Sequence, residues 1–360
     1  MALLCFELWS SIFEFPISIF QFPVSDSSVD NLTHTLTAVA ISQAGLNRKT
    51  RFATLTVILG ANLPDIDLIA RLDSSATYLK YHRGITHSIL GVTVLALLLE
   101  WTVSVLGRKA QPRPHGAGPP LAGRWLLLAA WLGTASHLLL DFTNAYGVRL
   151  FMPFSARWYA WDIMFIFDPL LLALLIIGLG LPSILGLVSE EVGVKQMRPR
   201  WGAVFSLCAL ALLWGVRDFA HRRVLTQLDA HTYSNENPLR LGAFPVAINP
   251  FAWTGVVETE SAYHVLAADA RANDIDPDSA HVYHKPAPSA ALDSALKTRT
   301  AGIFMNFARF PWAQVEENDE GFSVTIRDLR FLGGFAGRRG FVVDIELDKS
   351  LHPRTESFSF

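Results

Sequence analysis

The chain has 360 residues, of which 51% are hydrophobic and only 17% are charged, and its formal net charge is −2. Soluble domains carry roughly 25% charged residues, so this composition excludes an ordinary soluble protein and indicates an integral membrane protein with a more polar remainder. The small negative charge gives no signal for nucleic-acid binding. The two cysteines, Cys5 and Cys208, offer neither a disulfide framework nor a cysteine zinc site, so any metal needs histidine and carboxylate ligands.

The first 28 residues have an unusual composition. They are rich in phenylalanine, they include Pro16 and Pro23, and they contain no lysine or arginine. A secretory signal peptide would begin with a positively charged segment. We therefore expect residues 1–28 to be a non-structural or misannotated extension, with translation starting at Val29 from a GTG codon. An intact mass of the native protein that starts at Met1 would contradict this expectation.

From Asp30 onward, apolar runs alternate with short polar connections, which predicts about five to six helices. The expected helices span 35–46, 52–63, 86–106, 125–141, 163–188 and 201–216. Pro64 should stop the second helix, and Pro169 and Pro182 should bend the fifth. Residues 68–83 and 111–123 are expected to be polar connections.

The composition changes after Arg217. Residues 218–360 contain no run long enough to span a membrane, and residues 322–327 and 341–347 alternate apolar and polar side chains as half-buried strands do. Turns are expected at the glycines between these strands, which are Gly333, Gly334, Gly337 and Gly340. We therefore expect a helical membrane domain over residues 29–217 and a smaller, β-rich soluble domain over residues 218–360.

Ionisable residues gather at the ends of the apolar runs. These positions are costly for ionisable groups near a bilayer, so such residues usually have a function. The candidate metal ligands are His34, Asp65, Asp67, His82, His87, His137 and Asp141.

The distribution of lysine and arginine predicts the topology. One set of loops carries ten basic residues, and the opposite set carries five. The first set is Arg48, Lys49, Arg51, Arg108, Lys109, Arg113, Arg124, Lys195, Arg198 and Arg200, and the second is Arg71, Lys80, Arg83, Arg149 and Arg157. Basic loops stay in the cytoplasm, so alternating helices place all the candidate ligands at one face, the outer one. We expect a multi-pass protein of the bacterial cytoplasmic membrane, with its metal site and C-terminal domain outside the cytoplasm.

The residue types suit a first-row metal. His137 and Asp141 lie four positions apart on a helix and project from the same side. Histidine and carboxylate ligands without cysteine favour zinc, with manganese or iron as alternatives. One of Asp65 and Asp67 could be a direct ligand while the other orients a histidine, and either could act as a general base. Arg83 could hold a phosphate or carboxylate group, because a guanidinium cannot bind a metal.

Other ionisable residues have ordinary interpretations. Asp162 and Asp168 flank an interfacial stretch and a proline, where aspartate most often caps a helix. Six further histidines are expected to be solvated surface residues. They are His115, His221, His231, His264, His281 and His284.

Four motifs resemble those of a known family. The motifs Asp30-Asn-Leu-Thr-His34, Leu63-Pro-Asp-Ile-Asp67, His82-Arg-Gly-Ile-Thr-His87 and Ser136-His-Leu-Leu-Leu-Asp141 are similar to those of the bacterial membrane-bound metal-dependent hydrolases, the YdjM-like inner-membrane proteins. Their order is also similar to that of the zinc-dependent phospholipase C and single-strand nuclease superfamily. This resemblance implies a helical zinc site that acts on phosphoesters. A second His-x-x-x-Glu/Asp pair and an N-terminal tryptophan ligand, which that superfamily has, are not evident here.

The sequence leaves three functions open. The leading hypothesis is a membrane-embedded metal-dependent hydrolase that uses metal-activated water on a phosphoester or lipid-linked substrate, with the bilayer and a small-molecule or lipid substrate as its partners. A metal-binding transporter would need polar residues along the later helices, but residues 92–99 and 170–181 contain almost none. A non-catalytic membrane anchor for the C-terminal domain is the third hypothesis.

Overall fold

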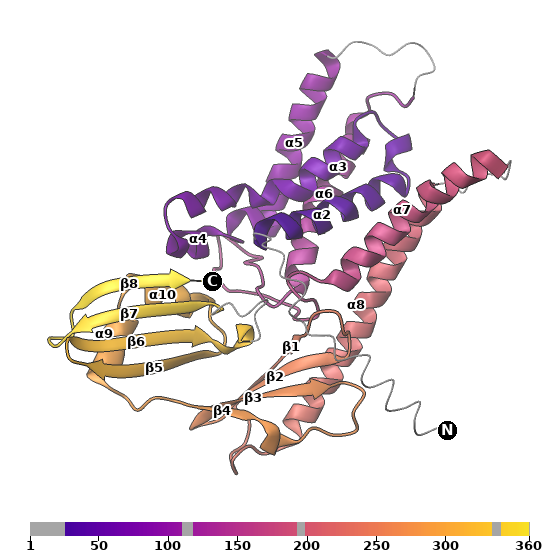
Figure 1. Ribbon diagram of the computed structural model, residues 1–360. Helices are drawn as coiled ribbons and strands as arrows, with labels where there is room; N and C mark the ends of the chain where they lie inside the picture. The colour runs from indigo at the N-terminus through magenta and orange to yellow at the C-terminus, as the bar shows by residue number, and fades with distance from the viewer. Residues whose placement is uncertain (1–25, 110–117, 193–198, 333–339, 360) are drawn as a thin grey trace, which may run out of the picture.

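The computed structural model describes residues 26–109, 118–192, 199–332 and 340–359, and it has a helical part followed by two small antiparallel sheets (Figure 1). The helices are α2 (Asp26–Gln43), α3 (Ala53–Asn62), α4 (Ser75–Tyr81), α5 (Ile89–Lys109), α6 (Gly123–Thr143), α7 (Pro169–Val192), α8 (Pro199–Asp229), α9 (Ala290–Leu296) and α10 (Arg299–Phe307). The expected fold class, a helical membrane part followed by a β-rich part, is confirmed.

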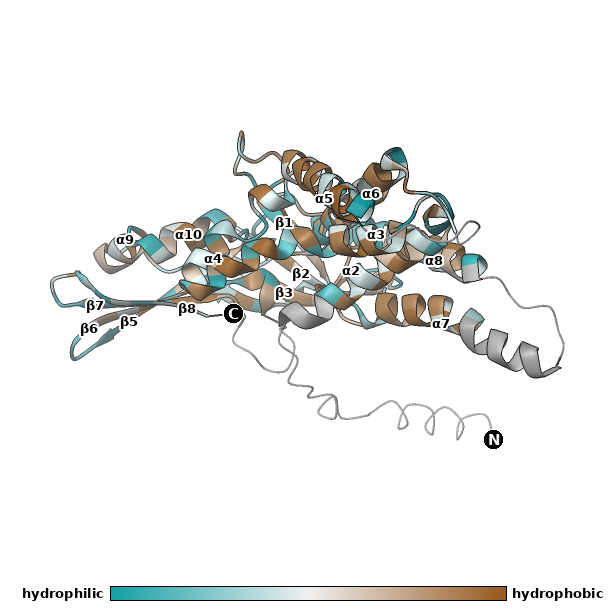
Figure 2. Ribbon diagram, turned by 90° about the horizontal axis from the view of Figure 1, so that it is seen from above, coloured by the Kyte–Doolittle hydropathy of each residue, from teal (hydrophilic) through white to brown (hydrophobic). Residues whose placement is uncertain are grey.

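Four helical segments of the described chain are long and apolar enough to cross a membrane. They are Ala53–Leu72, Ile89–Lys109, Gly123–Thr143 and Arg200–Asp229, and Pro169–Pro182 is a shorter apolar helix. Most residues of α5 and of the Pro169–Pro182 part of α7 are hydrophobic (Figure 2). Helix α2 is not among the candidate spans, because threonines and a histidine interrupt its apolar residues.

Several predicted boundaries differ from the structure. Helix α2 begins at Asp26, so His34 lies inside this helix and not at its start; the rest of the predicted extension, residues 1–25, lies outside the described residues. The connection predicted for residues 68–83 contains helix α4 and the second half of a long 3₁₀ helix, η3 (Leu63–Leu72). The fifth helix begins only at Pro169, because Ile163 and Met164 bond to the backbone of Thr143 instead.

Helix α8 runs past the predicted domain boundary at residues 217–218 and ends at Asp229. Its last turns carry Ala220, Val224 and Leu228 at the spacing of a helical stripe, and these side chains are buried in the core of the first sheet. The membrane part and the first sheet are therefore joined by one continuous helix, which Figure 1 shows running down beside β1 and β2.

Each sheet is a four-stranded antiparallel meander. The first contains β1 (Arg240–Pro245), β2 (Ala252–Glu258), β3 (Ala262–Asp269) and β4 (His281–His284), and the second contains β5 (Pro311–Asn318), β6 (Gly321–Asp328), β7 (Val342–Asp348) and β8 (Pro353–Ser359). Strands β6 and β7 confirm the two predicted strands. Of the predicted turn glycines, Gly340 has a positive φ of 70°, and the others lie outside the described residues.

The prediction that His264 is a surface residue is wrong. This side chain is only 1% exposed, because it lies on a covered face of β3 against the ring of Tyr233 at 5.3 Å. A single histidine in a polar-looking segment does not reveal which face of a strand it occupies, since that depends on the tertiary packing.

Helices α3 and α6 approach each other closely at a pair of glycines. A Cβ on Gly133 would lie 2.5 Å from the carbonyl oxygen of Val57, and one on Gly60 would lie 2.9 Å from that of Ala130. Small residues permit such close backbone contact between membrane helices. The contact sets the distance between the α3–η3 segment, which carries two candidate ligands, and α6, which carries two more.

We expect Gly133→Val to destabilise the protein by about 1–3 kcal/mol, because the added side chain overpacks a backbone contact that cannot yield locally. Gly215→Val on α8 is the matched control, since a Cβ there meets nothing within 4 Å. Thermal unfolding in detergent measures the stability of both variants. Equal stability of the two would contradict the close contact between α3 and α6.

A candidate metal centre

The structure brings the seven predicted ligands together. They come from α2 (His34), η3 (Asp65 and Asp67), the C-terminal cap of α4 (His82), the 3₁₀ helix η4 that spans Ile85–His87 (His87) and α6 (His137 and Asp141). The four histidines and Asp141 are at most 6% exposed, and the side chains of Asp65 and Asp67 are 14% and 8% exposed. Three overlapping groups among them have ligand atoms close enough to share an ion: His34–His137–Asp141, Asp65–His87–His137 and Asp65–Asp67–His82.

Four of these side chains surround one point. The Nε2 atoms of His87 and His137 lie 3.0 Å apart, and their distances to Asp65 Oδ1 and Asp141 Oδ2 are 3.3–3.5 Å. Tetrahedral zinc has bonds of about 2.0–2.1 Å to nitrogen and oxygen, so its ligand atoms lie about 3.3–3.4 Å from one another. Both nitrogens therefore lie at about the distance from both oxygens that ligand atoms keep around a first-row ion.

The hydrogen bonds of the two histidines aim their lone pairs at this point. His137 Nδ1 lies 2.7 Å from the carbonyl oxygen of Ala61, which can only accept, so Nδ1 carries the proton. His87 Nδ1 lies 3.1 Å from Asp67 Oδ2, which makes Nδ1 the donor there as well. Two Nε2 lone pairs that face each other at 3.0 Å, beside two carboxylates, require a proton or a cation between them. The donor set therefore fits a metal ion.

Asp67 organises the loop that presents two of the histidines. Its Oδ1 lies 2.9 Å from His82 Nδ1, and its Oδ2 accepts from the backbone nitrogen of Arg83 at 3.0 Å and from Thr86 Oγ1 at 2.7 Å, besides the contact with His87. Because these donors use both oxygens, the geometry favours an orienting role for Asp67 over direct ligation or base catalysis. Ser88 caps α5 by accepting from the backbone nitrogen of Gly91.

We expect Asp67→Asn to weaken metal affinity about 10–100-fold, which is the usual effect of losing a carboxylate that orients ligand histidines. Asp73→Asn is the matched control, because Asp73 is an exposed aspartate at the end of the same 3₁₀ helix. Competition with a chelator of known affinity measures both; equal affinities would exclude the orienting role.

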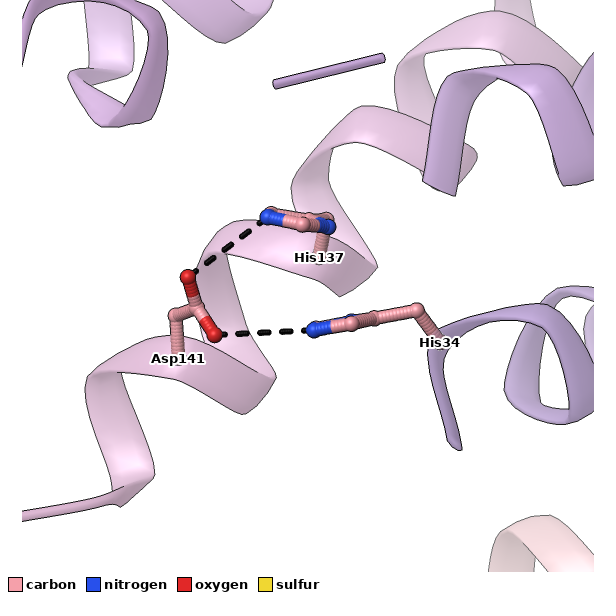
Figure 3. Close-up of side chains that lie close together, drawn as sticks. All are labelled: His34, His137 and Asp141. Atoms are coloured by element: carbon pink, nitrogen blue, oxygen red, sulfur yellow. Dashed lines mark ion pairs between the residues drawn. The ribbon is translucent and has the colours of Figure 1, made fainter. Parts of the chain in front are cut away.

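His34 extends the site along α6. Its ring stacks on that of His137 with centroids 4.0 Å apart, and its Nε2 lies 3.5 Å from Asp141 Oδ1 (Figure 3). Asp141 thus faces His34 with one oxygen and the four-atom cluster with the other. The oxygen that faces His34 also pairs with Arg83, so Asp141 connects His34 and Arg83 with the two facing histidines.

Arg83 contacts the cluster through Asp141. Its backbone is left-handed, with φ of 52°, a strained conformation for a residue other than glycine. The guanidinium is buried, and it pairs with Asp141 Oδ1 through Nη2 at 2.9 Å and with Asn144 Oδ1 through Nη1 at 2.9 Å. Arg83 therefore holds a candidate ligand, and its predicted contact with an anionic substrate stays a prediction.

Three further residues, whose roles the sequence did not reveal, hold this site. Asn144 bonds to Arg83, and the Arg149 guanidinium donates to the carbonyl oxygens of Lys80 and His82 at the end of α4. Tyr146 lies under Arg83, whose guanidinium carbon is 4.8 Å from the ring centroid, and burial raises the pKa of Tyr146 above its usual range. The basic and aromatic residues after α6 could have indicated a role in the site. A loop at the membrane interface has the same composition, however, so this pattern alone does not distinguish the two.

Of the two aspartates expected to cap helices, Asp168 has this role, whereas Asp162 forms an ion pair. Asp168 caps α7 by accepting from the backbone nitrogens of Leu170 and Leu171, and it pairs with buried Arg217. Asp162 pairs with Arg309 of the β-rich part. Neither lies in the metal-ligand groups found among the described residues.

A helical membrane part with a buried histidine–aspartate cluster at the ends of its helices defines this protein as a multi-helix membrane protein with a candidate metal centre. The family model of the YdjM inner membrane protein matches residues 29–224, and the chain belongs to this family. The match includes every candidate ligand.

The chain is also similar to the uncharacterized protein YfhP of Bacillus subtilis (strain 168). The two are 35% identical over 135 residues, which is 38% of this chain and 37% of that relative. The chain thus aligns with little more than a third of the length of the curated relative. No solved structure matches it.

Proposed function

We propose that this inner-membrane protein is a metal-dependent hydrolase that acts on a phosphoester, with a lipid-linked compound as its substrate. The observation that carries the proposal is the convergence of two imidazole nitrogens and two carboxylate oxygens, with each nitrogen within 3.5 Å of both oxygens. A divalent ion held there supplies Lewis-acid activation of water and of the phosphoryl group at neutral pH. Zinc suits these ligands best, with manganese and iron as alternatives.

The residues of the cluster have different roles in this proposal. His87 and His137 are fixed in one tautomer by Asp67 and by the carbonyl of Ala61, so their Nε2 atoms stay available as ligands. Asp65 is the most exposed carboxylate of the cluster, and it can both contact an ion and accept a proton from the attacking water. Arg83 neutralises part of the charge on Asp141.

The surface beside Asp65 supports a lipid-linked substrate. In a 3₁₀ helix, residues three apart lie on one ridge, and η3 presents Ile66, Ile69 and Leu72 at this spacing with exposures of 59%, 69% and 86%. This apolar ridge lies within the candidate membrane span Ala53–Leu72, which also contains α3. A substrate with a hydrocarbon tail could therefore approach the centre from the bilayer.

The experiment compares purified protein loaded with zinc, manganese or iron on bis(p-nitrophenyl) phosphate and on phospholipid in mixed micelles. We expect metal-dependent release of product that Asp65→Asn reduces at least about 100-fold, as expected for a group that acts in the transition state. His281→Ala, which changes an exposed histidine on β4, is the control. A metal-loaded protein inactive on both substrates would contradict the proposal and favour ion transport or a purely structural centre.

Topology gives a separate prediction. We propose that the centre faces the extracytoplasmic side, because the loops at the opposite ends of the helices carry the larger number of basic residues. A reporter fused after residue 115 should therefore report a cytoplasmic location, and one fused after residue 230 an extracytoplasmic location. Both fusions reporting the same side would contradict this topology.

A further inference from the structure

The loop that follows α6 connects the candidate metal centre with the second sheet. Asn144 caps the end of α6, three residues after Asp141. Its Oδ1 accepts from Arg83 Nη1 at 2.9 Å and from the backbone nitrogens of Tyr146 and Gly147 at 3.0 and 3.3 Å. One side-chain oxygen thus fixes both the fold of this loop and the direction of the Arg83 guanidinium.

Two arginines of the β-rich part hold the next residue of this loop. Arg330 Nη1 donates to the carbonyl oxygen of Ala145 at 2.7 Å, and Arg309 Nη2 donates to the same oxygen at 3.2 Å. Arg330 is only 6% exposed, and its other nitrogens bond to Asp328 and to the carbonyl oxygen of Phe307. Because a guanidinium is a rigid planar fork, these partners fix the position of Ala145 relative to the second sheet.

Apolar packing joins the same two regions. The ring of Tyr146 contacts Arg83 and also the rings of Phe307 and Phe341, whose centroids lie 4.7 and 5.5 Å from its own. Tyr146 and Leu79 are buried in the hydrophobic core formed by α9, α10 and strands β6 and β7. Figure 1 shows α4 lying above α10 and β8 in agreement with this contact.

We propose that the module formed by α9, α10 and β5–β8 is a structural part of the metal centre, because its Arg330 and Arg309 hold Ala145 and thereby fix Asn144 and Arg83 against Asp141. The two arginines are positioning residues, since they reach the candidate ligands only through this loop. The inference rests on the proposed metal centre, and it assigns a function to the C-terminal module: it maintains the shape of the site.

Arg330→Lys in the full-length protein tests the inference. Lysine keeps the positive charge beside Asp328. It lacks the planar guanidinium, whose two terminal nitrogens donate to the carbonyl oxygens of Ala145 and Phe307 at the same time. We expect faster hydrogen exchange at the amides of Tyr146 and Gly147 and about tenfold weaker zinc affinity, the lower end of the range for outer-shell changes. Arg354→Lys, on an exposed ion pair with Glu320 of the same module, should change neither measurement.

A double-mutant cycle separates positioning from general destabilisation. If Arg330 acts through Asn144, the loss of zinc affinity in Arg330→Lys/Asn144→Ala should not exceed that of Asn144→Ala alone. Additive losses, or unchanged exchange at Tyr146 and Gly147 in Arg330→Lys, would overturn the inference. A wild-type protein that binds no metal would refute the proposed hydrolase, while the exchange measurement would still decide whether Arg330 positions the loop.

Discussion

Replacing His137 or Asp141 with alanine should remove the bound ion from the purified protein. Wild-type protein should carry at least one zinc-like ion per chain, and each variant should bind it at least about 100-fold more weakly, beyond the 10–100-fold effect of outer-shell changes. The reason is geometric. His137 Nε2 and Asp141 Oδ2 lie 3.5 Å apart on successive turns of α6, and each also lies within 3.5 Å of another candidate ligand atom.

Elemental analysis after dialysis against a chelator measures this loss. His281→Ala is the control for removing a histidine, and thermal unfolding shows whether the variants still fold. Full metal occupancy in both variants would exclude this pair as ligands and, with it, the proposed centre.

Among substitutions of residues that are not candidate ligands, Arg83→Ala should cause the largest loss of folding stability. The guanidinium and the Asp141 carboxylate are both almost completely buried and lie 2.9 Å apart. Breaking such a pair by removing one partner leaves an uncompensated buried charge, which costs about 3–5 kcal/mol. We therefore expect Arg83→Ala to unfold at a lower temperature and to lose metal affinity, because Asp141 also loses the contact that orients it.

Arg83→Lys should restore part of the stability but little of the metal affinity, since a single ammonium group cannot contact Asp141 and Asn144 as the planar fork does. Arg157→Ala in the exposed part of the loop after α6 is the control. Normal stability and metal content combined with lost hydrolysis would favour the other role predicted for Arg83, that of holding an anionic substrate. Unchanged stability, metal content and hydrolysis would contradict both roles.

The residues of the candidate site could be predicted because ionisable side chains are costly beside long apolar runs. His87, His137 and Asp141 stand out in such a sequence, and the alternation of helices places the ends that carry them at one face. The sequence could not separate the roles of Asp65 and Asp67, since both closely follow Pro64. In the structure Asp67 contacts His82 and His87, whereas Asp65 faces the Nε2 atoms.

The sequence by itself determined the class of the protein, the helical part, the strands β6 and β7, and the set of candidate ligands, because hydrophobic periodicity and the cost of buried charge act locally along the chain. Only the tertiary structure decided where α8 ends and which side chains contact each other in the candidate site. Helix α8 continues to Asp229 because the first sheet covers its apolar stripe, and Arg83 pairs with Asp141 because the loop at Asn144 lies against the module that carries Arg330. These contacts join residues far apart in the sequence, and no local pattern specifies them.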